Sequence, residues 1–317
     1  MLQLAVNWNP SPELFSIGSF SIRYYGLMFV IAFVLGIQIM KRIYKNENVP
    51  VEYVDSLFMY TVVATLLGAR LGDVFFYSWD HYQNNLIEIL LPIKAAEGGS
   101  LFGVIDGYRF VGFAGLASHG AAIGIVLAMI LYRRKYNYKS LLWILDRVVI
   151  AVASGAIFIR LGNLMNSEIV GKVTNSDFGF RFIRDHYSKS EALFKTGTND
   201  YERAYTLIEE SSRFKDLLEA VPLRYPTQLF ESFSYVFVFL ILWFTYWKTD
   251  KKEKSGFLFG LFMILLWTVR FFIEFLKEPQ VDGREDLFMT LNTGQLLSLP
   301  MIIVGLYFVF RPIKTTT

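Results

Sequence analysis

The chain has 317 residues, of which 54% are hydrophobic and 19% charged, and its formal net charge at pH 7 is +3. Soluble domains are nearer ~45–50% apolar and ~25% charged, so this composition is typical of a membrane protein. The basic residues are spread through short loops, which argues against a nucleic-acid partner, and the absence of cysteine excludes disulfides and thiolate metal ligands.

A transmembrane helix needs about 20 mostly apolar residues, and the sequence contains about seven such runs. Residues 1–23 form a polar arm before the first run, and we expect this arm to lie outside the membrane. The predicted spans are 24–40, 54–77, 116–132, 141–163, 227–247, 256–276 and 293–310. We therefore predict an all-α polytopic membrane protein whose transmembrane helical domain covers residues 24–317.

Short loops that are rich in lysine and arginine remain in the cytoplasm, and they therefore predict the orientation. Four basic clusters share one face of the membrane only if the number of spans is odd. These clusters lie at residues 41–45, 133–139, 248–254 and 311–314. The N-terminus is then outside and the C-terminus cytoplasmic.

Two outer connections are long, at residues 78–115 and 164–225. Within the second, helical spacing relates Ala204, Ile208, Phe214, Leu217, Leu218 and Val221. Asn199 or Asp200 can cap this helix. The pattern predicts a small helical head over residues 164–225, between spans four and five.

Polar and charged residues near or inside the spans are the candidates for function, because a charge in hydrocarbon costs roughly 2.5–3.5 kcal/mol on insertion scales. They are Arg70, His119, Arg160, Asn163, Asn166, Glu168, Gln228, Glu231, Arg270 and Glu274. Under the predicted topology most of them lie near the outer ends of their spans, and Arg270 lies about two turns deeper. The sequence therefore predicts a polar site that opens outward.

Simpler explanations are open for each candidate. Arg70 or Arg160 can extend to the membrane interface, although Asn163 shares a helix face with Arg160. Arg270 and Glu274 are four residues apart and can form a structural ion pair. The remaining candidates can be helix caps or satisfied interface groups.

Two deep arginines, a lone histidine and several carboxylates favour chemistry on a phosphate-bearing lipid. A guanidinium binds two phosphate oxygens at once and keeps its charge in low dielectric. A histidine can take a proton near neutral pH from a nucleophile that the substrate brings. His81, His119 and His186 lie far apart without carboxylates at ligand spacing, so we expect no metal.

The stretch RLGNLMNSEIVGK at residues 160–172 resembles the signature of the prolipoprotein diacylglyceryl transferases, a family of bacterial membrane enzymes. Other stretches that resemble the family follow its order along the chain. They are YYGLMF (24–29), GARLGDVFFY (68–77), HGAAIG (119–124), YPTQLFE (225–231), GLFMILLWTVRFFIEFLKEPQ (260–280) and TGQLLSLPMIIVG (293–305). The outer loops alone lack such a match.

The resemblance implies transfer of the sn-1,2-diacylglyceryl group from phosphatidylglycerol to the lipobox cysteine in the signal peptide of a prolipoprotein. A thioether forms and glycerol phosphate leaves, without a metal or other cofactor. The resemblance also implies that the protein lies among the lipids of the bacterial inner membrane. Its N-terminus is then periplasmic and its C-terminus cytoplasmic.

The resemblance also assigns roles to individual residues. Arg160 matches the arginine that binds the lipid phosphate, Arg270 a second essential arginine, and His119 the proposed base. Other residues of the family's cavity match Tyr25, Asn163 and Glu168, with Glu231, Glu274 and Arg70 in supporting positions.

Three positions depart from the family's pattern. Tyr225 replaces a histidine of many members, Asp73 a common aromatic residue, and Ala121 a glycine. These departures leave open which group finally accepts the proton of the thiol.

Two functions of other classes are alternatives. A transporter of lipids or anionic solutes would bind its cargo with the same arginines and would tolerate the loss of His119. The absence of an internal repeat argues against a transporter built from inverted halves. A structural membrane protein would tolerate the loss of each charge singly.

Overall fold

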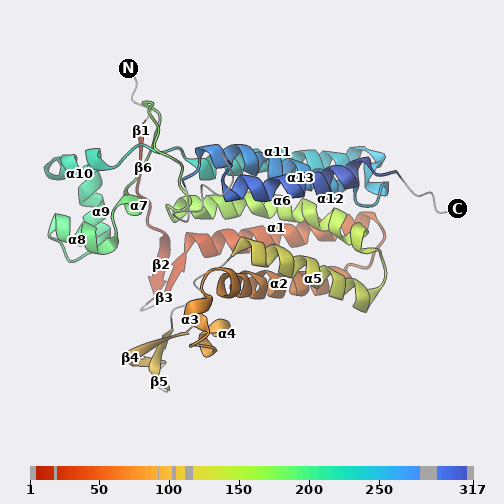
Figure 1. Cartoon of the computed structure of the whole chain (residues 1–317), viewed down its shortest axis with the longest axis horizontal. Coiled ribbons are helices and arrows are strands. Elements are labelled where there is room, and N and C mark those ends of the chain that lie inside the picture. Colours follow the sequence, from red (N-terminus) through yellow and green to blue (C-terminus); the bar gives the residue numbers. More distant parts are fainter. Residues whose placement is uncertain are drawn as a thin grey trace. The chain divides into compact units, whose positions relative to one another are not determined.

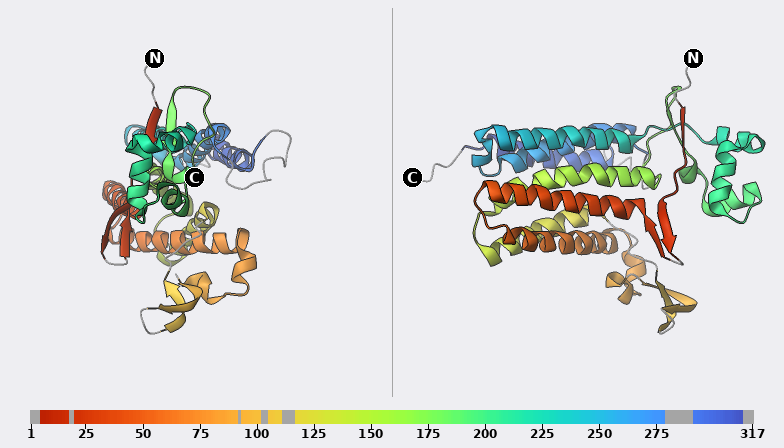
Figure 2. Two further views of the ribbon diagram at one scale, coloured as in Figure 1. Left: turned by 90° about the vertical axis from the view of Figure 1, so that its left-hand side faces the viewer. Right: turned by 180° about the vertical axis from the view of Figure 1, so that it is seen from behind.

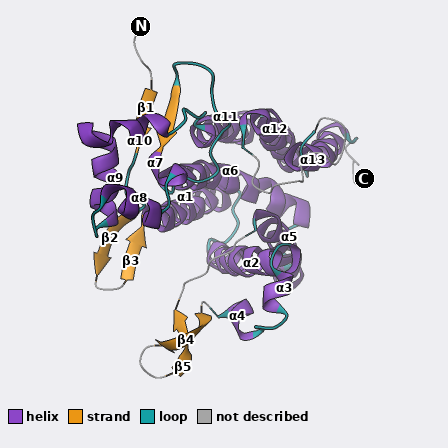
Figure 3. Cartoon of the chain, turned by 60° about the vertical axis from the view of Figure 1, so that its left-hand side comes forward, coloured by secondary structure: helices purple, strands orange, loops and turns teal. Residues whose placement is uncertain are grey.

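The computed structural model describes residues 5–17, 20–91, 93–101, 105–110, 117–278 and 291–312. The chain divides into two compact units, residues 1–39 with 146–317 and residues 40–145. Long helices predominate in both units, and the strands are short (Figure 3).

The first unit contains most of α1 and α6 together with three complete long helices. Their bounds are α1 (Tyr24–Asn46), α6 (Leu141–Met165), α11 (Thr227–Lys248), α12 (Phe257–Ile273) and α13 (Thr293–Phe310). Helices α6, α11, α12 and α13 run side by side in Figure 1, and Figure 2 shows α1 along α6. Glycines allow this close approach, because a Cβ on Gly162 would lie 2.6 Å from Cδ2 of Tyr25.

A buried carboxylate on α6 holds the beginning of α12. Asp146 accepts the backbone amide of Gly256 at 2.6 Å through Oδ2 and that of Phe259 at 2.8 Å through Oδ1. The first amides of a helix have no partner within the helix, so Asp146 satisfies them from a neighbouring helix. Gly256 has a φ of 87°, a conformation that glycine adopts at little cost.

Five helices of the described chain are long and apolar enough to cross a membrane. They are α1, α2 (Glu52–Phe76), α6, α11 and α12 with the 3-10 turn η3 (Glu274–Leu276). Helix α5 (Ser118–Tyr136), whose last turn is basic, and the shorter α13 are not among the five. Each of the seven apolar runs overlaps a helix of the described chain, in agreement with the prediction of a helical multi-pass membrane protein.

In the second unit, α2 and α5 pack through glycines on both helices. A Cβ on Gly124 of α5 would lie 2.6 Å from the carbonyl oxygen of Ala64, and one on Gly72 would lie 2.6 Å from Cα of Gly120. Backbone therefore meets backbone along this contact. The unit also holds α3 (Trp79–Tyr82), α4 (Ile87–Leu90) and an antiparallel pair, β4 (Ile93–Leu101) with β5 (Ile105–Phe110).

The described part of the head contains four short helices and one 3-10 turn, and a second 3-10 turn follows α11. The helices are α7 (Ile183–His186), α8 (Lys189–Thr196), α9 (Tyr201–Glu210) and α10 (Lys215–Ala220), with η1 (Ser212–Phe214) in the head and η2 (Asp250–Glu253) after α11. Asp200 caps α9 as the sequence predicts, with its side chain accepting the amide of Glu202 at 2.9 Å. The single helix predicted to Val221 is wrong, because the chain breaks at Ser211 between α9 and α10.

The N-terminal arm joins the head instead of standing apart from it. Strand β1 (Ala5–Trp8) pairs in parallel with β6 (Gly179–Phe182), and β2 (Glu13–Ile17) pairs with β3 (Phe20–Arg23). These sheets are an addition to the predicted all-α fold. Arg184 of the head donates to Oδ1 of Asn9 at 2.9 Å and forms an ion pair with Glu202 at 2.6 Å.

Candidate active site

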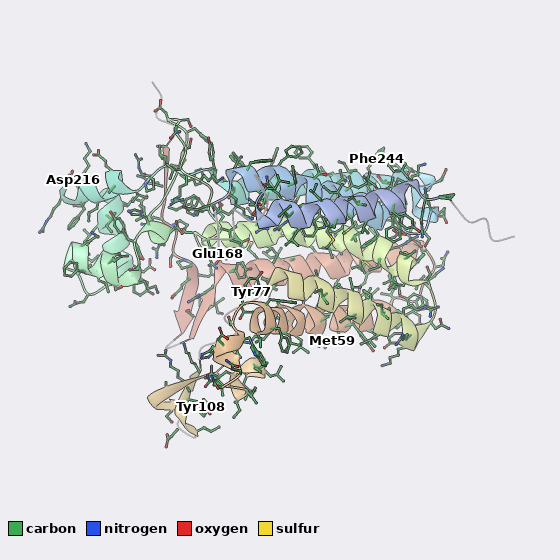
Figure 4. All side chains as sticks on the ribbon, in the orientation of Figure 1. Met59, Tyr77, Tyr108, Glu168, Asp216 and Phe244 are labelled. Carbon is green, nitrogen blue, oxygen red and sulfur yellow. The ribbon has the colours of Figure 1, made fainter. Side chains whose placement is uncertain are left out.

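Three polar side chains singled out in the sequence form a chain of hydrogen bonds at the end of α6. Nη1 of Arg160 donates to Oδ1 of Asn163 at 3.1 Å, and Nδ2 of Asn163 donates to Oε1 of Glu168 at 2.8 Å. Glu168 lies at the end of α6 nearest the head (Figure 4). The expected common helix face of Arg160 and Asn163 is thereby confirmed.

The turn that carries Glu168 has an unusual backbone. Ser167 and Ile169 have φ angles of 52° and 60°, in the left-handed region. Such angles are uncommon for residues other than glycine, above all for the β-branched Ile169, and cost about 1–3 kcal/mol each, so the surroundings must hold them. Two side chains of α11 do so, since Thr227 donates to the carbonyl of Ile169 at 3.0 Å and Gln228 to that of Glu168 at 2.7 Å.

Helix α11 also supplies the direct partner of Arg160. Nε of Arg160 lies 2.6 Å from Oε2 of Glu231, whose side chain is 1% exposed. The hydroxyl of Tyr235, one turn further along α11, forms a hydrogen bond with the same guanidinium. Because Arg160 has these contacts inside the helix bundle, free extension to the interface does not describe its position.

Tyr25 reaches the same place from α1. Its ring packs against Gly162, where a Cβ would lie 2.6 Å from Cδ2, and its hydroxyl forms a hydrogen bond with Asn163. The carboxylate of Glu168 is close enough to the Tyr25 hydroxyl to interact with it electrostatically. The structure thus brings together Tyr25, Arg160, Asn163, Glu168 and Glu231.

Lys277 is a site residue that the sequence analysis missed. Its side chain is 6% exposed, and Nζ lies 3.7 Å from Oε1 of Glu231 and 3.6 Å from Oε2 of Glu274. Burial lowers the pKa of Lys277 below its usual value, while the charge of Glu231 acts in the opposite direction. A lysine directly after an apolar run ordinarily extends to the interface, so its sequence position gave no signal.

Arg270 does not pair with Glu274, although they are four residues apart. Of the two, Glu274 pairs with Lys277, and no ion pair within the described chain joins it to Arg270. The guanidinium of Arg270 lies 5.4 Å from the ring of Trp267, and its buried Nε makes no hydrogen bond with a described residue. An unused buried donor of this kind is suited to an anionic ligand.

Arg160 and Arg270 lie around one buried region. Tyr235 is within electrostatic range of both guanidiniums, and so is Lys277. The two arginines come from α6 and α12, two helices far apart in sequence. The charges of both guanidiniums therefore act on the same two groups, Tyr235 and Lys277.

A three-segment backbone cluster, residues 170–174, 223–225 and 276–278, fixes the position of Lys277. The amide of Gly171 donates to the carbonyl of Tyr225 at 3.0 Å, and the amide of Lys172 donates to that of Leu276 at 2.8 Å. A Cβ on Gly171 would lie 2.7 Å from Cβ of Tyr225 and 2.9 Å from the oxygen of Leu276. The cluster leaves no space for a side chain at position 171.

Two predicted residues belong to the second unit. His119 lies in the first turn of α5, and its side chain lies outside the described residues. Arg70 is buried on α2, where Nε donates to the carbonyl of Ile89 at 2.9 Å and the guanidinium stacks 4.7 Å from the ring of Tyr82. These contacts give Arg70 a structural task, namely to hold the segment that contains α3 and α4.

In the described part of the chain, no group of three or more His, Asp or Glu side chains is arranged to hold a metal ion. The polar side chains near the end of α6 are instead paired with one another and with basic groups. The arrangement can bind an anion and stabilise negative charge that develops on it.

Comparison with known proteins gives a family for the whole chain. Residues 12–311 match the model of the family described as prolipoprotein diacylglyceryl transferase. A phosphatidylglycerol–prolipoprotein diacylglyceryl transferase of Bacteroides fragilis is 38% identical over 311 residues, which cover 98% of this chain and 96% of that protein. The enzymes of the same name from Chloroherpeton thalassium and Porphyromonas gingivalis are 35% and 34% identical, and the alignments cover 97% and 98% of this chain and 94% and 95% of those proteins. The sequence motifs, the buried arginines and these matches agree, and the chain belongs to the prolipoprotein diacylglyceryl transferase family.

Proposed function

We propose that this protein transfers the diacylglyceryl group of phosphatidylglycerol to the lipobox cysteine of a prolipoprotein. The observation that carries the proposal is the buried Nε donor of Arg270, which no described residue uses, on a guanidinium whose charge acts on Lys277 together with that of Arg160. A buried pair of guanidiniums is suited to a lipid phosphate, which must be bound without bulk water.

The reaction is a displacement at a carbon atom of glycerol. The substrate's thiolate forms a bond to the glyceryl carbon, the bond from that carbon to the phosphate oxygen breaks, and glycerol phosphate leaves with the electron pair. Arg160 and Arg270 stabilise the charge that develops on the leaving phosphate, which lowers the barrier more than binding the ground state does.

The thiol must lose its proton before it attacks efficiently, because its free pKa is about 8.5. We assign the role of base to His119 on the strength of its motif. Asn163 and Glu168 orient the guanidinium of Arg160, and Tyr25 packs against α6 beside them. Glu231 and Glu274 balance the positive charges, and Arg70 supports the second unit.

We further propose seven membrane crossings. The pairing of β1 with β6 supports an even number of crossings between the arm and the head, because both strands must lie on one side of the membrane. Four long helices of the described chain lie between these strands, and α1, α2 and α6 are long and apolar enough to cross. Three crossings would place the strands on opposite sides, so we count α5 as the fourth.

The three-segment backbone cluster indicates how the last three helices, α11, α12 and α13, cross the membrane. Residues 276–278 after α12 hydrogen-bond to residues 170–172 after α6, so α11 and α12 leave and return to the same side. Helix α13 then crosses last. This topology places the arm and head in the periplasm and the C-terminus and the basic loops in the cytoplasm of a bacterial inner-membrane protein.

The partners in this proposal are phosphatidylglycerol, other membrane lipids and the signal peptide of a prolipoprotein. Lipid enters sideways from the bilayer, and the signal helix approaches through a second opening, steered by the head over residues 164–225. Nucleic acid has no part in the reaction.

The test is incubation of the purified protein with phosphatidylglycerol and a lipobox peptide, followed by mass measurement of the peptide. We expect a gain of one diacylglyceryl group, no gain with a peptide whose cysteine is replaced by serine, and no gain with Arg160→Ala. Normal membrane insertion of the variant is the control. A wild-type protein that moves lipid between leaflets without modifying the peptide would overturn the proposal in favour of a transporter.

A further inference from the structure

Five charged side chains, here named the Glu231 cluster, meet between the ends of α6, α11 and α12. They are Arg160, Glu231, Arg270, Glu274 and Lys277. These three cations and two carboxylates have a formal charge of +1 by themselves, and Glu168 adds a negative charge nearby, because Asn163 bridges it to Arg160. A phosphodiester that approaches Arg160 therefore meets carboxylates as well as cations.

The two contacts of Glu231 are unequal. Its Oε2 lies 2.6 Å from Nε of Arg160, whereas its Oε1 lies 3.7 Å from Nζ of Lys277. Neither carboxylate oxygen forms a hydrogen bond of good geometry with a described residue. Lys277 is equally far from its other partner, Glu274, at 3.6 Å. The ammonium is therefore near two carboxylates without a close bond to either.

We infer that Glu231 is an exchangeable counterion, which pairs with Arg160 in the lipid-free enzyme and moves to Lys277 when the phosphodiester binds Arg160. The inference rests on the proposed function. Lys277 is then a positioning residue, since it acts through Glu231 and does not touch the reacting atoms.

The exchange has a physical reason. A phosphate that approaches Arg160 meets a carboxylate already bound there, and like charges repel strongly in a buried place. A displaced carboxylate left unpaired in the protein interior would be costly. Lys277 removes both problems, because it can neutralise Glu231 within the same cluster.

The required movement is small. Charged N–O hydrogen bonds are about 2.7–2.9 Å long, so the Glu231 carboxylate has to approach Lys277 by only about 1 Å. A rotation of side chains provides this without a shift of helices. The backbone of Lys277 is fixed meanwhile, because Leu276 accepts the amide of Lys172 at 2.8 Å and Glu278 donates to Val170 at 3.2 Å.

The first test is Lys277→Met, with initial rates measured over a range of phosphatidylglycerol concentrations in mixed micelles. We expect the KM for the lipid to rise at least roughly tenfold, equivalent to about 1.4 kcal/mol, with a smaller change in kcat. Lys277→Arg should retain a KM near that of the wild type. The matched control is Lys41→Met, because Lys41 forms an exposed ion pair with Asp55 at 3.2 Å, outside the head and the Glu231 cluster, and should not affect KM.

The second test is the double variant Lys277→Met with Glu231→Gln. Glutamine has no charge with which to compete for Arg160, so the KM should fall at least severalfold below that of Lys277→Met. A lysine with a purely structural role predicts no such recovery in lipid KM, because removal of the Glu231 charge would not restore the packing that Lys277→Met disturbs. If Lys277→Met does not fold, Lys277→Gln takes its place in both measurements.

The outcomes separate the inference from the function on which it rests. A wild-type protein that forms no thioether product disproves the proposed function. A wild-type protein that forms product, together with an unchanged lipid KM in Lys277→Met or no recovery in the double variant, disproves the exchange alone.

Discussion

The side chain of Gln228 donates a hydrogen bond to the backbone carbonyl of Glu168 at 2.7 Å, and this bond ties the first turn of α11 to the turn after α6. Gln228 is fully buried, and the turn that it holds contains two residues with left-handed backbone angles. The position of the Glu168 carboxylate therefore depends on an amide from another helix.

Gln228→Leu should reduce transfer activity about tenfold or more, because the loss of a hydrogen bond to a buried carbonyl costs about 1–3 kcal/mol and releases the strained turn. Steady-state rates with the lipobox peptide measure the effect. Thr245→Val is the control, since Thr245 bonds only within α11, to the carbonyl of Ile241 at 2.7 Å. Full activity of Gln228→Leu would mean that the turn holds its conformation without this bond.

Arg160→Lys should lose most of the activity even though it retains the positive charge. The guanidinium contacts Asn163 and Glu231 through different nitrogens, at 3.1 and 2.6 Å, and a single ammonium cannot make both contacts and bind two phosphate oxygens. The measurement is the rate of thioether formation, with membrane insertion checked by fractionation. Wild-type turnover would show that the forked geometry has no role.

His119→Asn should be severely impaired at neutral pH and partly recover at high pH. The thiol has a free pKa of about 8.5, so alkaline solution deprotonates it without help from the protein. A pH series of initial rates from neutral to alkaline values, with wild type in parallel, measures this recovery. A near-normal rate at neutral pH would transfer the role of base to another group, with Glu168 and Tyr25 as the next candidates.

Gly171→Ala should abolish activity or prevent folding. The added methyl group would lie 2.9 Å from the carbonyl oxygen of Leu276 and 2.7 Å from Cβ of Tyr225, and the hydrogen-bonded backbone there cannot give way cheaply. Activity and thermal unfolding in detergent provide the readouts. Gly26→Ala is the control on α1, because a Cβ at Gly26 has no neighbour within 4 Å. An active, normally stable Gly171→Ala protein would contradict the tight packing.

Asp146→Ala should lower the stability of the protein by about 0.5–2 kcal/mol, the range for loss of a helix cap. Its carboxylate accepts two amides at the start of α12, at 2.6 and 2.8 Å, and lies away from the Glu231 cluster. The expected result is a lower melting temperature with an unchanged KM for phosphatidylglycerol. The control is Asp250→Ala in the exposed turn η2. An altered lipid KM would show that the two ends of α12 are coupled.

The sequence was sufficient for the elements and contacts that depend on local spacing. Each apolar run falls on a helix, and Arg160 and Asn163, three residues apart, form a hydrogen bond as their common face predicts. Gln228 and Glu231 are also three residues apart, and both are buried. Gln228 contacts the backbone of Glu168, and Glu231 contacts the guanidinium of Arg160.

The remaining contacts depend on segments that meet only in the folded chain. Lys277 lies between Glu231 and Glu274 because α11 and α12 return to the same place, and no local pattern contains that information. The break at Ser211 was hidden for another reason. Apolar residues keep their helical spacing across it, while the Ser211 hydroxyl accepts the amide of Arg213 at 3.4 Å and starts a new turn.

The parallel pairing of β1 with β6 has a consequence for biosynthesis. Residues 5–8 leave the ribosome long before their partner, residues 179–182, exists. At about 5–20 residues per second the first strand waits roughly 10–30 seconds, with its hydrogen-bonding edge open, while the intervening helices enter the bilayer. Completion of this sheet is therefore a late event in assembly, and it joins the first-made and later-made parts of the chain once insertion of α6 has finished.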